Sequence, residues 1–174
     1  MQTNRSDRER AAQIVRDAGG RIVGRTRMQK IAFLLELTGL GEGFHFEYKH
    51  YGPYSDELTK AIRAAAAFGL VNVDEQQTSW GGWYSTYSAA DQRGKLSLKE
   101  PVSLAMEAAK LDPVELELAA TAAYLKIFEG YDDPWSETAR RKPEKAANGR
   151  LESAKAAYRQ LMSIEAPRRL PNIV

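Results

Sequence analysis

The sequence contains no cysteine and only two histidines, His45 and His50. Without cysteine there can be no disulfide bridge and no zinc site built on thiolates, and this composition suits a reducing cytoplasm. The two histidines are five residues apart, a spacing that places them together on neither a helix face nor a strand face. We therefore expect no metal site and no cofactor.

The sequence also lacks a large excess of positive or negative charge and long apolar runs. The chain has 25 basic and 23 acidic residues, so the strongly basic footprint of a nucleic-acid-binding protein is absent overall. No apolar run approaches the roughly 20 residues that span a bilayer, and the first ten residues are too polar for a signal peptide. We expect a cytoplasmic protein with no membrane partner.

The charge is unevenly distributed in the C-terminal half. Residues 101–137 hold 2 basic and 8 acidic residues, whereas residues 138–174 hold 9 basic and 3 acidic ones. One interpretation is an acidic helix face packed beside a basic one. The other is a basic patch that faces an acidic partner.

At 174 residues and 43% hydrophobic composition, the chain predicts one domain with a real core. We expect a winged-helix-like part over residues 1–90, a helical part over 91–165 and a tail over 166–174. The expected fold is mainly α with a small β-hairpin. In the first part the sequence predicts three helices, at residues 6–18, 26–38 and 55–68. A short strand at 70–73 and a hairpin at 77–88 follow, and the hairpin turns at Gly81-Gly82.

Capping patterns set several helix starts. Ser6 with Glu9, and Thr26 with Gln29, match the capping box, and Ser55 is a good N-cap ahead of two acids. In the second part, Asp-Pro pairs predict helix starts at 112 and 133, because aspartate caps and proline suits the first turn. Three of the four helices expected there cover residues 101–110, 134–142 and 148–162, and the other starts at 113 and extends at least to Phe128. The helix that starts at 113 is apolar on two sides, which is typical of a helix at the centre of a core.

No catalytic set is recognisable. There is no G-x-S-x-G elbow, and the glycines of Gly39–Phe44 are not followed by the Lys-Ser/Thr pair of a phosphate loop. We expect no catalytic residues and no enzyme activity, with an uncharacterised hydrolase as the weakest alternative.

DNA binding is the stronger alternative, because winged helices often bind DNA. The start of the third helix, where base contacts would arise, carries Asp56 and Glu57, which Lys60 and Arg63 only balance. The expected wing turn has no Lys or Arg, and this argues against DNA as the main ligand. A basic cluster of Arg25, Arg27 and Lys30 opens the second helix, either as a solvated helix end or as a contact with a partner.

Two stretches resemble a known family. "GRTRMQKIAFLLE" (Gly24 to Glu36) and "YGPYSDEL" (Tyr51 to Leu58) are similar, in this order and spacing, to the Panacea (SocA-like) antitoxin domain family and its YwgA-like relatives. The C-terminal "RRKPEKAANGRLESAKAAYRQL" is also similar to the YwgA-like end. Met28 stands where that family usually has Leu, and the Trp-Gly-Gly-Trp stretch has no match in its pattern.

The resemblance implies a winged-helix-like fold and a non-enzymatic protein that neutralises a toxin in a bacterial or phage system. A winged-helix transcriptional regulator is the alternative function. Gly52 and Pro53 are expected to form a turn, with tyrosines crowding the same corner either as core or as an aromatic contact surface. The candidate partner-binding residues are Tyr48, Tyr51, Tyr54, Arg27 and Lys30.

Overall fold

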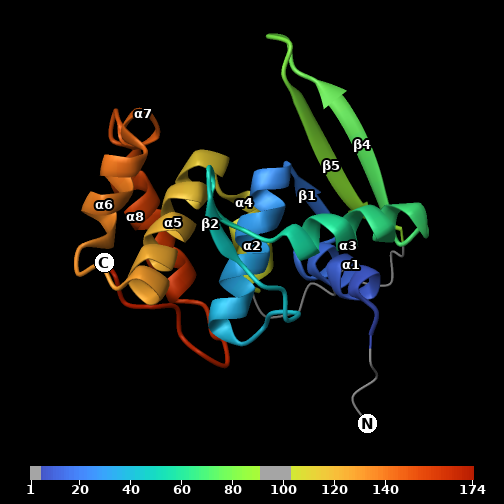
Figure 1. The fold of residues 1–174 in the computed structure, drawn as a ribbon, viewed down its shortest axis with the longest axis horizontal. Helices are drawn as coiled ribbons and strands as arrows, with labels where there is room; N and C mark the ends of the chain where they lie inside the picture. The colour runs from blue at the N-terminus through green and yellow to red at the C-terminus, as the bar shows by residue number, and fades with distance from the viewer. Residues whose placement is uncertain (1–4, 91–102) are drawn as a thin grey trace.

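A computed structural model describes residues 5–90 and 103–174, and within these ranges eight helices accompany two small antiparallel sheets (Figure 1). The fold is therefore mostly helical, as expected, but it contains more strand than a single hairpin. The elements in chain order are α1 (Asp7–Asp17), β1 (Arg21–Val23), α2 (Arg25–Thr38), β2 (Glu47–Lys49), β3 (Gly52–Tyr54), α3 (Asp56–Ala67), β4 (Val71–Gln77), β5 (Trp83–Ala89), α4 (Leu104–Lys110), α5 (Pro113–Glu129), α6 (Pro134–Arg141), α7 (Pro143–Ala146) and α8 (Arg150–Met162).

The larger sheet has the strand order β1-β5-β4. Strand β1 pairs only with the base of β5, from Arg21↔Ser88 to Val23↔Thr86, whereas β4 and β5 pair along their full length. The outer part of this hairpin therefore projects from the body of the protein (Figure 1). We call the β4–β5 hairpin, Val71 to Ala89, the ribbon.

The smaller sheet is a hairpin inserted between α2 and α3, which we call the tyrosine hairpin (Glu47 to Tyr54). The expected turn at Gly52-Pro53 is wrong, because Lys49 pairs with Gly52 and the two-residue turn is His50-Tyr51. Gly52 has a φ of +86° and is buried directly against α5. Its lack of a side chain allows strand β3 to approach the helix closely.

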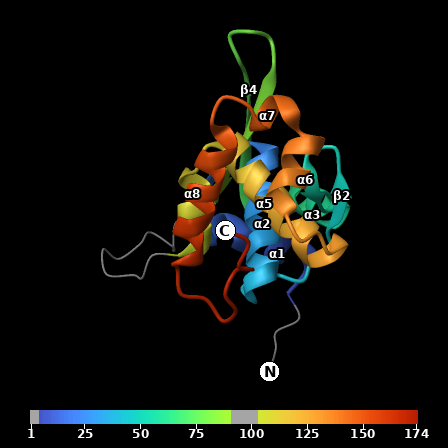
Figure 2. The same ribbon diagram turned by 90° about the vertical axis from the view of Figure 1, so that its left-hand side faces the viewer.

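Helix α5 is the central element of the second half. Its buried side chains face several directions, and α2, α6, α8 and β3 all pack against it (Figure 2). This confirms the prediction from its two apolar stripes. The C-terminal tail lies against the same body, where the carbonyl groups of Pro171 and Ile173 accept hydrogen bonds from Tyr158 and Trp135 at 2.7 Å.

Most predicted caps are confirmed. Ser6 forms its capping box, and Ser55 accepts a hydrogen bond from the backbone N–H of Leu58. Asp112 and Asp133 cap α5 and α6. The Thr26–Gln29 box is wrong, since α2 follows Gly24 and the Gln29 carboxamide bonds instead to the backbone of Ser55.

The remaining boundaries differ in small ways. Strand β1 and the short α7 were not predicted, and the last helix follows Gly149. Helix α4 is capped by Ser103, while the predicted start at Pro101 lies outside the described residues.

Candidate functional site

The tyrosine hairpin presents one exposed aromatic side chain at its turn. Tyr51 is 51% exposed, and its ring lies edge-on to His50 at 4.9 Å between centroids. The Lys145 ammonium lies 4.6 Å from the centre of the Tyr51 ring, within the range of a cation–π contact. Tyr51 is thus contacted by His50 and Lys145 while about half of the residue stays exposed.

The other two tyrosines of the hairpin are more integrated in the fold. Tyr48 packs against Tyr124 with 5.7 Å between ring centroids, and the Arg141 guanidinium lies 4.8 Å from the centre of its ring. The Tyr54 hydroxyl is 2.6 Å from Thr59 Oγ1, which ties the end of β3 to α3. The structure therefore divides the tyrosine corner into one exposed anchor and two half-buried supports.

A buried charged cluster lies beneath the tyrosine hairpin. Its members, Lys30, Glu117, Lys142 and Lys145, come from α2, α5, the α6–α7 junction and α7, and we call them the lysine cluster. Glu117 is only 3% exposed and accepts bonds from Lys142 at 2.8 Å and Lys145 at 2.7 Å. Lys142 also donates to the His50 carbonyl at 3.2 Å, so the cluster attaches the hairpin turn to the C-terminal helices.

Lys30 is a structural residue rather than a surface contact. Its side chain is 1% exposed, and its ammonium donates a 2.7 Å hydrogen bond to the Pro53 carbonyl. The expectation that Lys30 touches a partner is wrong, because α5 and the hairpin cover it completely. Burial lowers its pKa to about 7, while Glu117 opposes this shift and the two neighbouring lysines add to it.

This environment predicts a pH dependence of stability. Lys30 loses its proton near pH 7 in the folded protein but near 10.5 when unfolded, so the unfolded state binds more protons between these values. Titration of Lys30 should therefore make the free energy of unfolding rise as the pH increases through that window. The slope of the rise should approach about 1.4 kcal/mol per pH unit. Urea unfolding across the window should show the rise, and Lys30→Met should remove it.

Lys60→Met, which changes an exposed lysine of α3, is the matched control and should keep the parent slope. An identical slope in the parent and in Lys30→Met would show that Lys30 stays protonated throughout the window.

Arg27 likewise supports the fold. Its guanidinium donates to the Val23 carbonyl at 2.6 Å and to the Leu111 carbonyl at 2.7 Å, joining β1 and α2 to the loop before α5. Burial lowers its pKa, with Asp112 opposing the shift. Two of its guanidinium nitrogens are therefore bonded to backbone carbonyls, and its role as a cationic contact stays a prediction.

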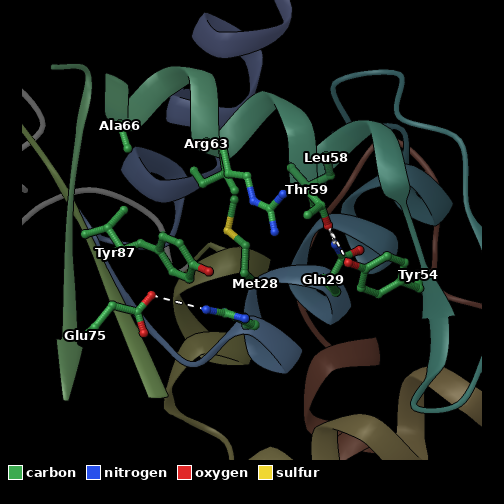
Figure 3. Close-up of a pocket in the computed structure, with 12 residues that line it drawn as sticks. Met28, Gln29, Tyr54, Leu58, Thr59, Arg63, Ala66, Glu75 and Tyr87 are labelled. Carbon is green, nitrogen blue, oxygen red and sulfur yellow. Dashed lines mark hydrogen bonds and ion pairs between the residues drawn. The ribbon is translucent and has the colours of Figure 1, made fainter. Parts of the chain in front are cut away.

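A groove opens between α3, the start of α2 and the ribbon (Figure 3). Its volume is about 290 Å³, and its walls are mainly apolar, with Met28, Leu58, Ile62 and Val73 among the lining residues. Arg63 reaches into it from α3, and Tyr87 points toward the same space from the ribbon (Figure 3). Of the candidate residues from the sequence, only Tyr54 lines this groove.

The ribbon carries two exposed tryptophans at its tip. Trp80 is 81% exposed and Trp83 is 67% exposed. A Cβ at Gly82 would overlap with the Trp80 ring, so the glycine leaves room for the indole to lie over the turn. From the sequence we predicted only a turn in this stretch, although two tryptophans in a turn also indicate a surface aromatic site.

Part of the opposite charge of the two C-terminal segments pairs between them. Arg141 bonds to Glu129 and Glu137, and the two guanidinium groups of Arg140 and Arg141 lower the pKa of Glu137 to about 2. With Glu117 and its lysines, these pairs support the interpretation of acidic and basic faces packed together. The lysine cluster was not predicted from the sequence, although Glu117 lies between the apolar Leu116 and Leu118, and an acid in such a position can indicate a buried ion pair.

Within residues 5–90 and 103–174, no group of three potential metal-ligating side chains occurs, and no helix is long and apolar enough to cross a bilayer. His45 lies beside Glu47 with 3.8 Å between their polar atoms, at an exposed position.

Comparison with known proteins finds a distant similarity. No protein-family model matches the chain. The uncharacterized protein YwgA of Bacillus subtilis (strain 168) is 28% identical over 122 residues, which cover 66% of this chain and 70% of that protein. The chain is thus similar to YwgA, and this relationship agrees with the YwgA-like part of the resemblance seen in the sequence.

Proposed function

We propose that this protein is a non-catalytic interaction module that binds and neutralises a protein partner, in the manner of an antitoxin. The observation that carries the proposal is the pair of exposed indoles, Trp80 and Trp83, on a ribbon that projects from the body (Figure 1). Tryptophan is enriched among the residues that dominate binding energy at protein interfaces. Two of them exposed on one tip form an apolar feature that a partner would cover.

The exposed Tyr51 supports the same proposal. It stands on a hairpin that the lysine cluster holds in place, so an interface there would need little ordering on binding. The partner that we infer is a growth-inhibiting protein of a bacterial or phage toxin–antitoxin system, a class suggested by the family resemblance.

A DNA-binding regulator is the second candidate, and the topology favours it. Apart from the inserted β2–β3 hairpin, the order α1, β1, α2, α3, β4, β5 with a β1-β5-β4 sheet is similar to a winged helix, with α3 at the recognition position and the ribbon as the wing. Electrostatics favours the first candidate. The exposed acids Asp56 and Glu57 open α3, and no basic residue lies between Trp80 and Trp83.

The test is rescue of cells from the toxic product of a neighbouring gene. We expect Trp80→Ala/Trp83→Ala, and separately Tyr51→Ala, to abolish rescue while the melting temperature stays within a few degrees of the parent. Truncating an exposed interface aromatic costs about 2 kcal/mol or more of binding but removes little monomer packing. Rescue and thermal melting are measured on the same variants.

Phe68→Ala is the control, because Phe68 is 66% exposed but lies at the end of α3 beneath Arg8. It should rescue like the parent. If the tryptophan and tyrosine variants rescue fully, while Lys60→Gln/Arg63→Gln abolishes repression of the protein's own promoter, the regulator is the better assignment.

A further inference from the structure

The groove between α3 and the ribbon combines an apolar interior with an excess of positive charge. Arg25 is engaged, because its guanidinium donates to Ser85 Oγ at 3.1 Å and lies 3.3 Å from Glu75. Arg63 makes no hydrogen bond or ion pair with the rest of the described chain, and it points into the groove (Figure 3). The groove lining thus holds two guanidinium groups and one carboxylate, together with Met28 and Ile62.

The polar groups at the other end of the groove are already satisfied. The Gln29 carboxamide donates to the Ser55 carbonyl at 3.1 Å and to Thr59 Oγ1 at 3.0 Å, and Tyr54 bonds to the same threonine. A ligand is therefore not needed to complete this network. Among the described residues Arg63 has no bonded anion, which makes a carboxylate the expected polar contact.

The strand register extends the groove toward the tip of the ribbon. The cross-strand pairs Val73↔Tyr87, Glu75↔Ser85 and Gln77↔Trp83 are separated by two residues along each strand, so all six side chains lie on one face. Val73, Glu75 and Tyr87 line the groove, and Trp83 therefore lies on the same face, farther out.

The size of the groove limits what it can accept. At about 290 Å³ it lies at the lower end of the range of small-molecule pockets, roughly 300–1,000 Å³, so it suits one large apolar side chain. A peptide that places one side chain in the groove can make further contacts along the ribbon, because the same ribbon face continues to Trp83. This combination fits an extended protein segment better than a free metabolite.

We infer that the groove is the docking site for a short acidic segment of the partner protein. The segment inserts one apolar side chain between α3 and the ribbon and places a neighbouring carboxylate on Arg63, and it continues along the ribbon toward Trp83. This inference rests on the proposed function only in assigning the segment to a protein partner.

The direct test uses three blocked dipeptides and the methyl NMR signal of Met28, assigned with a Met28→Leu variant. Acetyl-Asp-Phe-amide carries both features, acetyl-Asn-Phe-amide lacks the charge, and acetyl-Asp-Ser-amide lacks the apolar side chain. The first should shift the Met28 signal at about 10 mM, a concentration suited to the millimolar affinity of so small a ligand. The two others should bind about tenfold more weakly or not at all.

The Arg63→Gln variant separates charge recognition from folding. It should bind the Asp and Asn peptides almost equally, because only the preference for the carboxylate depends on Arg63. Arg159→Gln, at an exposed position of α8, should keep the parent's preference. No shift of Met28 with the first peptide, or an Asp preference that survives Arg63→Gln, would overturn the inference.

The outcomes are independent of the proposed function. Binding of the dipeptide without any rescue of cells would leave the groove assigned and the antitoxin role wrong. Rescue that persists in Arg63→Gln, together with no peptide binding, would place the partner on the tryptophan tip or Tyr51 alone.

Discussion

Replacing Glu117 by Gln should lower the free energy of unfolding by about 3–5 kcal/mol, since removing one member of a buried ion pair leaves its partner uncompensated. Glu117 is the only acid of the lysine cluster, and it is bonded to both Lys142 and Lys145. Lys30 is buried nearby and is stabilised in its charged form by the same carboxylate. Equilibrium unfolding in urea measures the loss.

Two further variants make this prediction specific. Glu144→Gln changes an exposed acid of α7 and should alter stability by less than about 0.5 kcal/mol. Adding Lys142→Met to Glu117→Gln should recover part of the loss, because it removes one of the buried charges that Glu117 balanced. A Glu117→Gln protein as stable as the parent would mean that water, rather than Glu117, compensates the lysines.

Gly52→Ala should destabilise the protein by about 2–5 kcal/mol, the sum of a backbone cost and a steric cost. Gly52 has a φ of +86°, which an L side chain adopts only with strain. Its Cβ would also overlap with Thr121 Oγ1, a buried hydroxyl of α5. The hairpin and α5 would have to move apart, and this would pull Pro53 away from Lys30.

Gly69→Ala isolates the backbone part of this cost. Gly69 has a φ of +72° after α3, but nothing lies within 4 Å of a Cβ there, so the loss should be only about 1–2 kcal/mol. Thr121→Ala should partly restore Gly52→Ala, because it removes the overlapping oxygen. Equal losses at the two glycines, with no coupling to Thr121, would show that the hairpin accommodates a methyl group without moving.

The two candidate surfaces depend on different parts of the structure. Tyr51 depends on the lysine cluster, so variants that weaken the cluster should impair stability and partner binding together. The groove depends on α3, the start of α2 and the ribbon, and none of its lining residues belongs to the lysine cluster. This separation allows the two surfaces to be tested with different sets of substitutions.

Local features were predictable from the sequence alone. Ser55, Asp112 and Asp133 cap helices because their short side chains accept bonds from backbone N–H groups a few residues on, a contact that needs no distant partner. The central position of α5 followed from apolar residues on two of its sides, and the ribbon followed from its alternating strands around Gly81-Gly82.

Only the tertiary structure decided the roles of the charged and aromatic residues. Lys30 and Arg27 begin a helix, and in the sequence they are indistinguishable from a solvated basic end. Their burial depends on β3 and on the loop before α5, which approach from elsewhere in the chain. In the same way, Arg63 and Tyr87 line one groove because the ribbon packs beside α3. Burial and side-chain orientation between distant segments depend on packing, and local spacing along the chain does not specify packing.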